Sequence, residues 1–159
     1  MVFVVECKPD RTLVKSLIPG QRIEHAGNKS GVLRRLTRNY ENSIGLIDQD
    51  PASHQPPDLE KFREIRSDTS NKLKVLYFNR KRNFIVILCP KLENWIIEAS
   101  HEANVNISEY KLPDDPDELH RNINLNLDKF EKLVSKLKQT SNRVRTLQNY
   151  LRNPSSIIA

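Results

Sequence analysis

The chain has 159 residues, of which 37% are hydrophobic, and carries a formal net charge of +6. This length suits one domain with a proper core, and two cysteines, Cys7 and Cys89, are too few for a disulfide framework. No apolar stretch reaches membrane-spanning length, and Met1 leads directly into a predicted strand rather than into a secretion signal. We therefore expect a cytoplasmic protein with no membrane partner, and the positive charge favours a polyanionic one.

The first half of the chain alternates short apolar segments with helical patterns. Asp10 is placed to cap the first helix, which Pro19-Gly20 ends. A polar, proline-rich loop follows the third strand, and residues 59–66 predict a further short helix. The predicted strands are residues 2–6, 21–24 and 43–47, and the predicted helices are residues 10–17 and 30–40.

The next segment predicts two strands, residues 74–78 and 84–88, joined by the basic connection Asn79-Arg80-Lys81-Arg82-Asn83. A helix over residues 92–103 follows Pro90. The alternation of strands and helices predicts an α/β fold with three layers, in which a mostly parallel sheet carries one antiparallel hairpin.

The character of the sequence changes from Asn106 onward. An acidic, proline-marked segment at residues 113–117 precedes purely helical patterns. We therefore predict an α/β domain over residues 1–110 and a helical extension, a helical hairpin, over residues 111–159. The hairpin is expected to break near Thr140-Ser141-Asn142, and its excess of basic residues fits either a solvated helix face or a surface for nucleic acid: Lys129, Lys132, Lys136, Lys138, Arg143, Arg145 and Arg152.

Acidic residues follow three of the predicted strands. Glu6 ends the first strand, Asp48 and Asp50 follow the third, and Glu93 comes just after residues 84–88. In open α/β sheets the carboxyl ends of the strands are where ligands bind. Asp48 and Asp50 are two residues apart, so in an extended chain they would point to the same side of the sheet, although a simple turn before Pro51 is the alternative.

Carboxylates brought together in this way favour a hard divalent cation. Mg²⁺, or Mn²⁺ in its place, is held by carboxylates and bridges to phosphate oxygens in sites for phosphoryl transfer. The four histidines are scattered and provide no close Cys/His group for zinc. Lys8, beside Glu6, is a candidate phosphate contact or an ion-pair partner, and Lys29 opens a helix whose free amides would attract an anion unless Asn28 caps them.

Three motifs resemble Toprim domains, the module shared by topoisomerases, primases and a group of nucleases. Val5-Glu6-Cys7-Lys8-Pro9-Asp10 resembles the motif that opens the family, with Cys7 in place of the usual glycine. Ile44-Gly45-Leu46-Ile47-Asp48-Gln49-Asp50 looks like its second, Asp-x-Asp motif. Pro90-Lys91-Leu92-Glu93-Asn94-Trp95-Ile96 is similar to an element of small stand-alone Toprim proteins related to the OLD-family nucleases. The resemblance covers about residues 2–100.

This resemblance implies a Rossmann-like fold and a metal-dependent nuclease. Glu6, Asp48 and Asp50 would be catalytic, and Glu93 would join them as a metal ligand. Lys8, Lys29 and the basic connection Arg80-Lys81-Arg82 would hold the phosphate backbone of a nucleic acid. The alternative is a non-catalytic subunit of a larger assembly with an ATPase partner protein, and a homodimer fits either hypothesis. A receiver-like domain with Asp48 as the phosphoacceptor is the third, lesser alternative.

Overall fold

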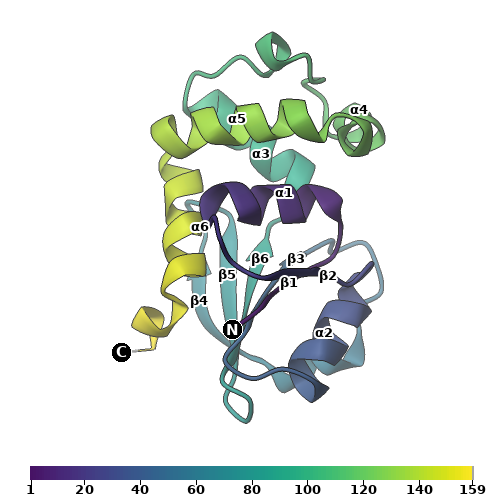
Figure 1. The fold of residues 1–159 in the computed structure, drawn as a ribbon, viewed down its shortest axis with the longest axis vertical. Coiled ribbons are helices and arrows are strands. Elements are labelled where there is room, and N and C mark those ends of the chain that lie inside the picture. Colours follow the sequence, from purple (N-terminus) through teal and green to yellow (C-terminus); the bar gives the residue numbers. More distant parts are fainter. Residues whose placement is uncertain (159) are drawn as a thin grey trace.

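A six-stranded sheet with helices on both faces organises the computed structural model, which describes residues 1–158 (Figure 1). No helix in that range is long and apolar enough to cross a membrane. The strands are β1 (Phe3–Val5), β2 (Ile23–His25), β3 (Ile44–Asp48), β4 (Arg63–Asp68), β5 (Leu73–Phe78) and β6 (Asn83–Leu88). The α-helices are α1 (Lys8–Leu17), α2 (Lys29–Arg38), α3 (Leu92–Glu102), α4 (Pro116–Asn122), α5 (Leu127–Thr140) and α6 (Asn142–Arg152). Four 3₁₀ helices complete the described chain: η1 (Pro57–Lys61), η2 (Ile107–Tyr110), η3 (Ile123–Leu125) and η4 (Pro154–Ile157).

The strand order is β2-β1-β3-β6-β5-β4. β2, β1, β3 and β6 run parallel, whereas β5 is antiparallel to β6 and β4 is antiparallel to β5. The predicted α/β sheet, mostly parallel with an antiparallel hairpin, is therefore confirmed. The antiparallel part is one strand larger than expected.

The additional strand is β4, and the helix predicted over residues 59–66 is wrong. That segment divides into η1 and the beginning of β4. β4 lies at the edge of the sheet and pairs only with β5, with an irregular register between Glu64 and Arg66. Only Ile65 of β4 packs against the core. Backbone pairing to β5, rather than an apolar pattern of its own, therefore decides its structure.

The two faces of the sheet are covered unequally. Helices α1, α3, α5 and α6 share one core with the first face, and Trp95 and Phe130 are its largest fully buried side chains. The other face packs against α2, which lies over β1 and β3 and contacts η1. The half of this face formed by β6, β5 and β4 is therefore left to η1 and its neighbouring loop.

The C-terminal helices close the first face rather than standing apart from it. α5 lies beside α1 (Figure 1), and Leu133 of α5 and Leu147 of α6 belong to the same core as the strands. The predicted break of the helical hairpin is confirmed, since α5 ends at Thr140 and Ser141 caps α6 by accepting the backbone N–H of Val144 at 3.1 Å.

Candidate functional site

The parallel strands bring three predicted acids to one edge of the sheet. Glu6 follows β1, Asp48 is the last residue of β3, and Glu93 lies in the first turn of α3, just after β6. β1, β3 and β6 are adjacent and parallel, so all three end at the same edge, which we call the carboxyl edge. The carboxylate of Glu6 accepts the backbone N–H of Asp48 at 2.7 Å, and the carboxylate of Asp48 accepts the backbone N–H of Leu92 at 3.1 Å.

A fourth acid, Asp10, joins them and was not predicted as a site residue. It is not the helix cap, because α1 begins at Lys8 and Cys7 is its N-cap. Asp10 is 2% exposed, and its Oδ2 accepts the thiol of Cys7 at 3.2 Å. Its Oδ1 is buried and has no hydrogen-bond partner within residues 1–158. Its place as the last acid of the first motif is the one sequence signal that could have assigned it to the site.

The pKa values of these carboxyl groups show that they lie within electrostatic reach of one another. Burial raises the pKa of Asp48 to about 9, and the charges of Asp10, Glu6 and Glu93 add to the rise. Burial also raises the pKa of Asp10 to about 7, again with contributions from Glu6 and Glu93. The pKa of Glu6 is raised by burial, against the opposing effects of the Asp48 N–H and the Lys29 ammonium. Four carboxylates therefore share a poorly solvated region in which negative charge is costly.

Asp50 is placed differently from the expectation. β3 ends at Asp48, and Asp50 has a left-handed backbone with φ of +43°, so the chain is no longer extended there. The carboxylate of Asp50 lies 3.6 Å from the ammonium of Lys91. Its charge still contributes to the raised pKa of Glu6, so it stays near the acids without continuing the β3 alternation.

Glu93 is held by a residue from the C-terminal extension. Its Oε1 lies 2.6 Å from Nδ1 of His120 in α4, and Glu93 is only 7% exposed. The extension therefore reaches the carboxyl edge. This contact could not be predicted from the sequence, because the two residues are 27 positions apart and belong to different predicted domains.

The candidate phosphate-binding lysines occupy two different environments. Lys29 is buried at the start of α2, and its ammonium donates to the backbone oxygen of Gln49 at 2.9 Å and to Oε1 of Gln55 at 3.0 Å. Asn28 caps this helix by accepting the N–H of Gly31, which confirms the capping alternative. Lys8 is exposed at the start of α1 and lines a groove between α1 and α5.

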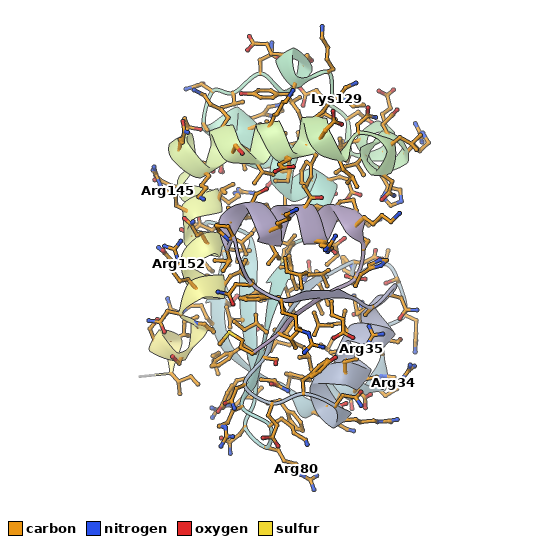
Figure 2. All side chains as sticks on the ribbon, viewed as in Figure 1. Arg34, Arg35, Arg80, Lys129, Arg145 and Arg152 are labelled. Atoms are coloured by element: carbon orange, nitrogen blue, oxygen red, sulfur yellow. The ribbon has the colours of Figure 1, made fainter. Side chains whose placement is uncertain are left out.

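The basic turn Arg80-Lys81-Arg82 is not brought to the acids. It connects β5 to the amino end of β6, whereas Asp48 pairs with Leu88 at the carboxyl end of β6. The length of a strand, about 17 Å, separates the two edges. Lys81 and Arg82 instead lie 3.7 and 3.6 Å from the carboxylate of Glu41, and Arg80 projects away from the body of the protein (Figure 2).

The donor set at the carboxyl edge suits a hard cation, although it is not arranged around one point. Within residues 1–158 no three His, Cys, Asp or Glu side chains already converge as metal ligands. Glu6 and Asp48 each use one carboxylate oxygen for a backbone N–H, and Asp10 keeps a buried oxygen without a partner. Free carboxylate oxygens in a poorly solvated region fit Mg²⁺ or Mn²⁺, which would also relieve their repulsion.

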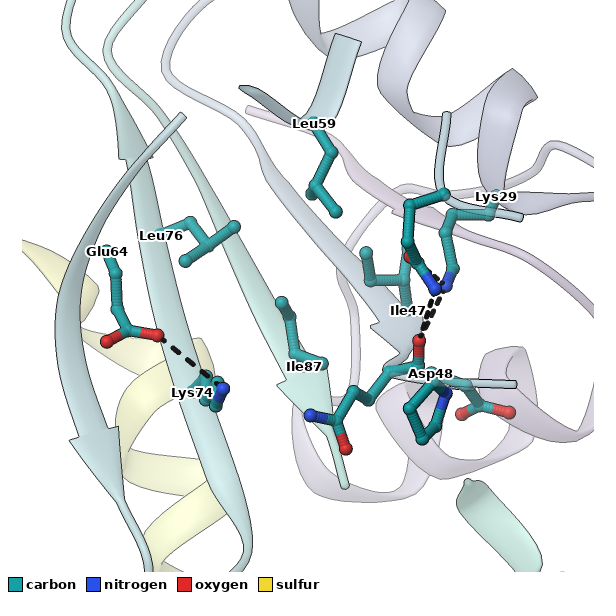
Figure 3. A pocket seen from close by; sticks show the side chains of 11 residues that line it. Lys29, Ile47, Asp48, Leu59, Glu64, Lys74, Leu76 and Ile87 are labelled. Atoms are coloured by element: carbon teal, nitrogen blue, oxygen red, sulfur yellow. Dashed lines mark hydrogen bonds and ion pairs between the residues drawn. The ribbon is translucent and has the colours of Figure 1, made fainter. Parts of the chain in front are cut away.

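A cavity of about 360 Å³ opens beside Asp48 on the sheet face that α2 covers only in part (Figure 3). Ile47, Leu76 and Ile87 lie on its sheet side, and Leu59 of η1 lies opposite. Lys29 and Lys74 line it as well. The sequence did not predict this cavity, because it depends on how far α2 extends across the sheet.

Comparisons with protein families, curated proteins and solved structures found no match.

Proposed function

We propose that this protein is a Mg²⁺- or Mn²⁺-dependent phosphoryl-transfer enzyme acting on nucleic acid, most specifically a nuclease of Toprim type. One observation carries the proposal: Glu6, Asp10, Asp48 and Glu93 lie within electrostatic reach of one another at the carboxyl edge of a parallel sheet, where burial and their repulsion raise the pKa of Asp48 to about 9. Four acids in such a place are costly for the fold, and a bound cation offsets that cost.

In this proposal the acids bind the cation and the lysines bind the phosphate groups. Glu6, Asp48, Glu93 and Asp10 would hold the cation, which when bound supplies positive charge to the phosphate oxygens. Asp50, at the rim, would orient the attacking water or a further ligand. Lys29 would place its ammonium beside the phosphate, since its charge already reaches Glu6. Lys8, exposed next to the acids at the start of α1, would hold the backbone of the strand.

The rival proposal is a non-catalytic Toprim-like subunit of an assembly that contains an ATPase. The retention of every acid at the carboxyl edge favours the enzyme, because a module without catalysis has no need for this electrostatic cost. A homodimer remains compatible with both proposals.

Cleavage of labelled nucleic acid tests the proposal. Single- and double-stranded DNA and RNA are incubated with the protein in Mn²⁺, in Mg²⁺ and in EDTA. We expect cleavage only with metal, and a loss of about a hundredfold or more in Asp48→Asn. Asp128→Asn, a change of the same kind on the exposed side of α5, is the matched control. Metal binding without cleavage of any substrate would favour the non-catalytic subunit.

A further inference from the structure

The cavity beside Asp48 has an apolar wall made by side chains of neighbouring strands. Ile47 of β3 is in register with Ile87 of β6, and Ile87 is in register with Lys74 of β5. Adjacent strands lie about 4.8 Å apart, so this row spans about 10 Å across the sheet. Leu76 lies two residues beyond Lys74 on β5, and so extends the same face of the sheet. The cavity volume of about 360 Å³ falls within the range of small-ligand sites.

Polar groups stand at both ends of this wall. Figure 3 shows Lys29 and Asp48 at one end and the ion pair of Lys74 with Glu64 at the other. The Lys29 ammonium has three donors, of which two are used by Gln49 and Gln55. The ammonium of Lys74 is 3.8 Å from Glu64.

Gln49 provides a side-chain amide that is available to form hydrogen bonds with a ligand. Its backbone oxygen is engaged by Lys29 and Gln55, but its side-chain amide has no hydrogen-bond partner in residues 1–158. It lines the cavity and also the smaller hollow that adjoins it near Cys89. A side-chain amide offers a donor and an acceptor together, which is the pattern that pairs with the edge of a nucleobase.

The cavity and the acids share Asp48. This residue belongs to the carboxylate group at the end of β3 and also lines the cavity. If a phosphate of a nucleic acid is held at the carboxyl edge, the nucleoside joined to it is therefore within reach of the apolar wall. A free inorganic anion would leave this wall without a partner, whereas a planar heterocycle would cover it.

We infer that this cavity receives one unpaired nucleobase of the substrate strand, next to the phosphate that the acids act on. The base lies against Ile87 and Leu76, and Gln49 contacts its polar edge. A base within a duplex is stacked on both sides and paired, and so cannot reach the wall without leaving the helix. The inference rests on the proposed function and specifies its substrate as single-stranded or locally unpaired nucleic acid.

Binding without catalysis tests this inference. Fluorescence anisotropy in EDTA compares a labelled hexadeoxythymidylate with a fully abasic hexamer of the same length and charge. We expect the wild type to bind the strand with bases about tenfold to a hundredfold more tightly. In Leu76→Trp, the indole fills the cavity and the preference should fall to about one. Leu125→Trp, the same substitution at a residue that is 87% exposed, should keep the full preference.

Gln49→Leu gives a second test at a side chain that makes no hydrogen bond in the described fold, so that a folding defect of Leu76→Trp leaves the question decidable. We expect it to reduce the preference severalfold. Equal binding of the two hexamers by the wild type would overturn the inference, as would an unchanged preference in both cavity variants. A base preference in EDTA without cleavage in Mn²⁺ would overturn the proposed nuclease alone. Cleavage of strands that bind with no base preference would overturn the cavity inference alone.

Discussion

The carboxylate of Glu6 accepts the backbone N–H of Asp48 at 2.7 Å and so ties the end of β1 to the end of β3. This hydrogen bond uses one oxygen of Glu6 and leaves the other available. The same arrangement recurs one strand further, where Asp48 accepts the N–H of Leu92. Backbone donors thus hold the acids in place, and the repulsion between their charges is the cost of that position.

The first prediction concerns stability against pH without metal. Asp10 and Asp48 have folded pKa values of about 7 and about 9, above the ordinary value of 3.8. A carboxyl group whose pKa is raised by folding stabilises the fold fully below its unfolded pKa, and this stability is lost as the pH rises through the folded value. We expect the free energy of unfolding in EDTA to fall between about pH 4 and pH 9. Urea titrations across this range measure it.

Asp10→Asn should make this fall shallower between about pH 4 and pH 7, where Asp48 still contributes, and at pH 8 it should stabilise the apo protein by up to about 4 kcal/mol. Asp128→Asn, with an exposed carboxylate, should keep the wild-type dependence. If the stability of Asp10→Asn depended on pH as that of the wild type does, the raised pKa of the buried Asp10 carboxyl group would be contradicted.

The second prediction concerns metal and the fold. A cation that binds only the folded protein raises the unfolding midpoint by mass action, by about 2.7 kcal/mol at a hundred times its dissociation constant. We expect Mg²⁺ and Mn²⁺ to raise the midpoint of the wild type in thermal unfolding. In Asp48→Asn/Asp50→Asn, the apo midpoint should be higher and the effect of metal should be absent. A metal effect that survives this double substitution would remove these acids from the ligand set.

The third prediction separates two arginines of α6. Arg143 is 4% exposed, and its guanidinium lies 2.8 Å from Glu98 and 2.7 Å from Glu102 of α3. Arg143→Met should cost about 2 kcal/mol, since the two glutamates are half exposed and solvent screens part of the interaction. Arg145→Met, at an exposed position, should change stability by less than about 0.5 kcal/mol. If urea unfolding gave similar losses of stability for both variants, the buried ion pairs of Arg143 would not contribute as expected.

The fourth prediction concerns the close packing of α2 on β3. A Cβ at Gly45 would lie 2.5 Å from Cδ1 of Leu36 and 3.0 Å from Cγ1 of Val32. Gly45→Ala should therefore force these side chains aside and destabilise the fold by about 1–3 kcal/mol. The double variant Gly45→Ala/Leu36→Ala should lose less stability than the sum of the losses of the two single variants. The reason is that Leu36→Ala removes the side chain with which the new Cβ collides. Strict additivity in urea unfolding would show that α2 lies further from the sheet.

The fifth prediction locates the surface that holds the nucleic-acid backbone. Lys8, Arg11 and Lys15 line the groove between α1 and α5, and α1 begins at the carboxyl edge. Replacing all three with alanine should reduce the slope of log affinity against log salt by about 2 for a single strand. The matched control replaces Arg80, Lys81 and Arg82, at the opposite edge, and should leave the slope unchanged. The reverse result would show that the nucleic-acid backbone binds at the basic turn rather than along α1.

Several elements could be predicted because their sequences carry a local pattern. β1, β3, β5 and β6 are apolar runs bounded by turn residues, and α2, α3, α5 and α6 show helical spacing with an apolar face. The parallel arrangement then follows from the alternation of strands and helices. This is enough to place Glu6, Asp48 and Glu93 at one edge of the sheet.

The tertiary structure decided the rest, because burial and charge environment depend on which elements pack together. β4 is a strand because β5 offers it a backbone partner, although its own sequence is charged. Arg143 sits in a basic segment and yet is buried, and its guanidinium pairs with Glu98 and Glu102 of α3. Asp10 has the sequence context of a helix cap but joins the acids, because α1 starts two residues earlier and turns its carboxylate inward. The sequence by itself determined that acidic residues stand at the ends of the strands. Only the packing of α1, α3 and α4 around them determined which carboxylates share a site.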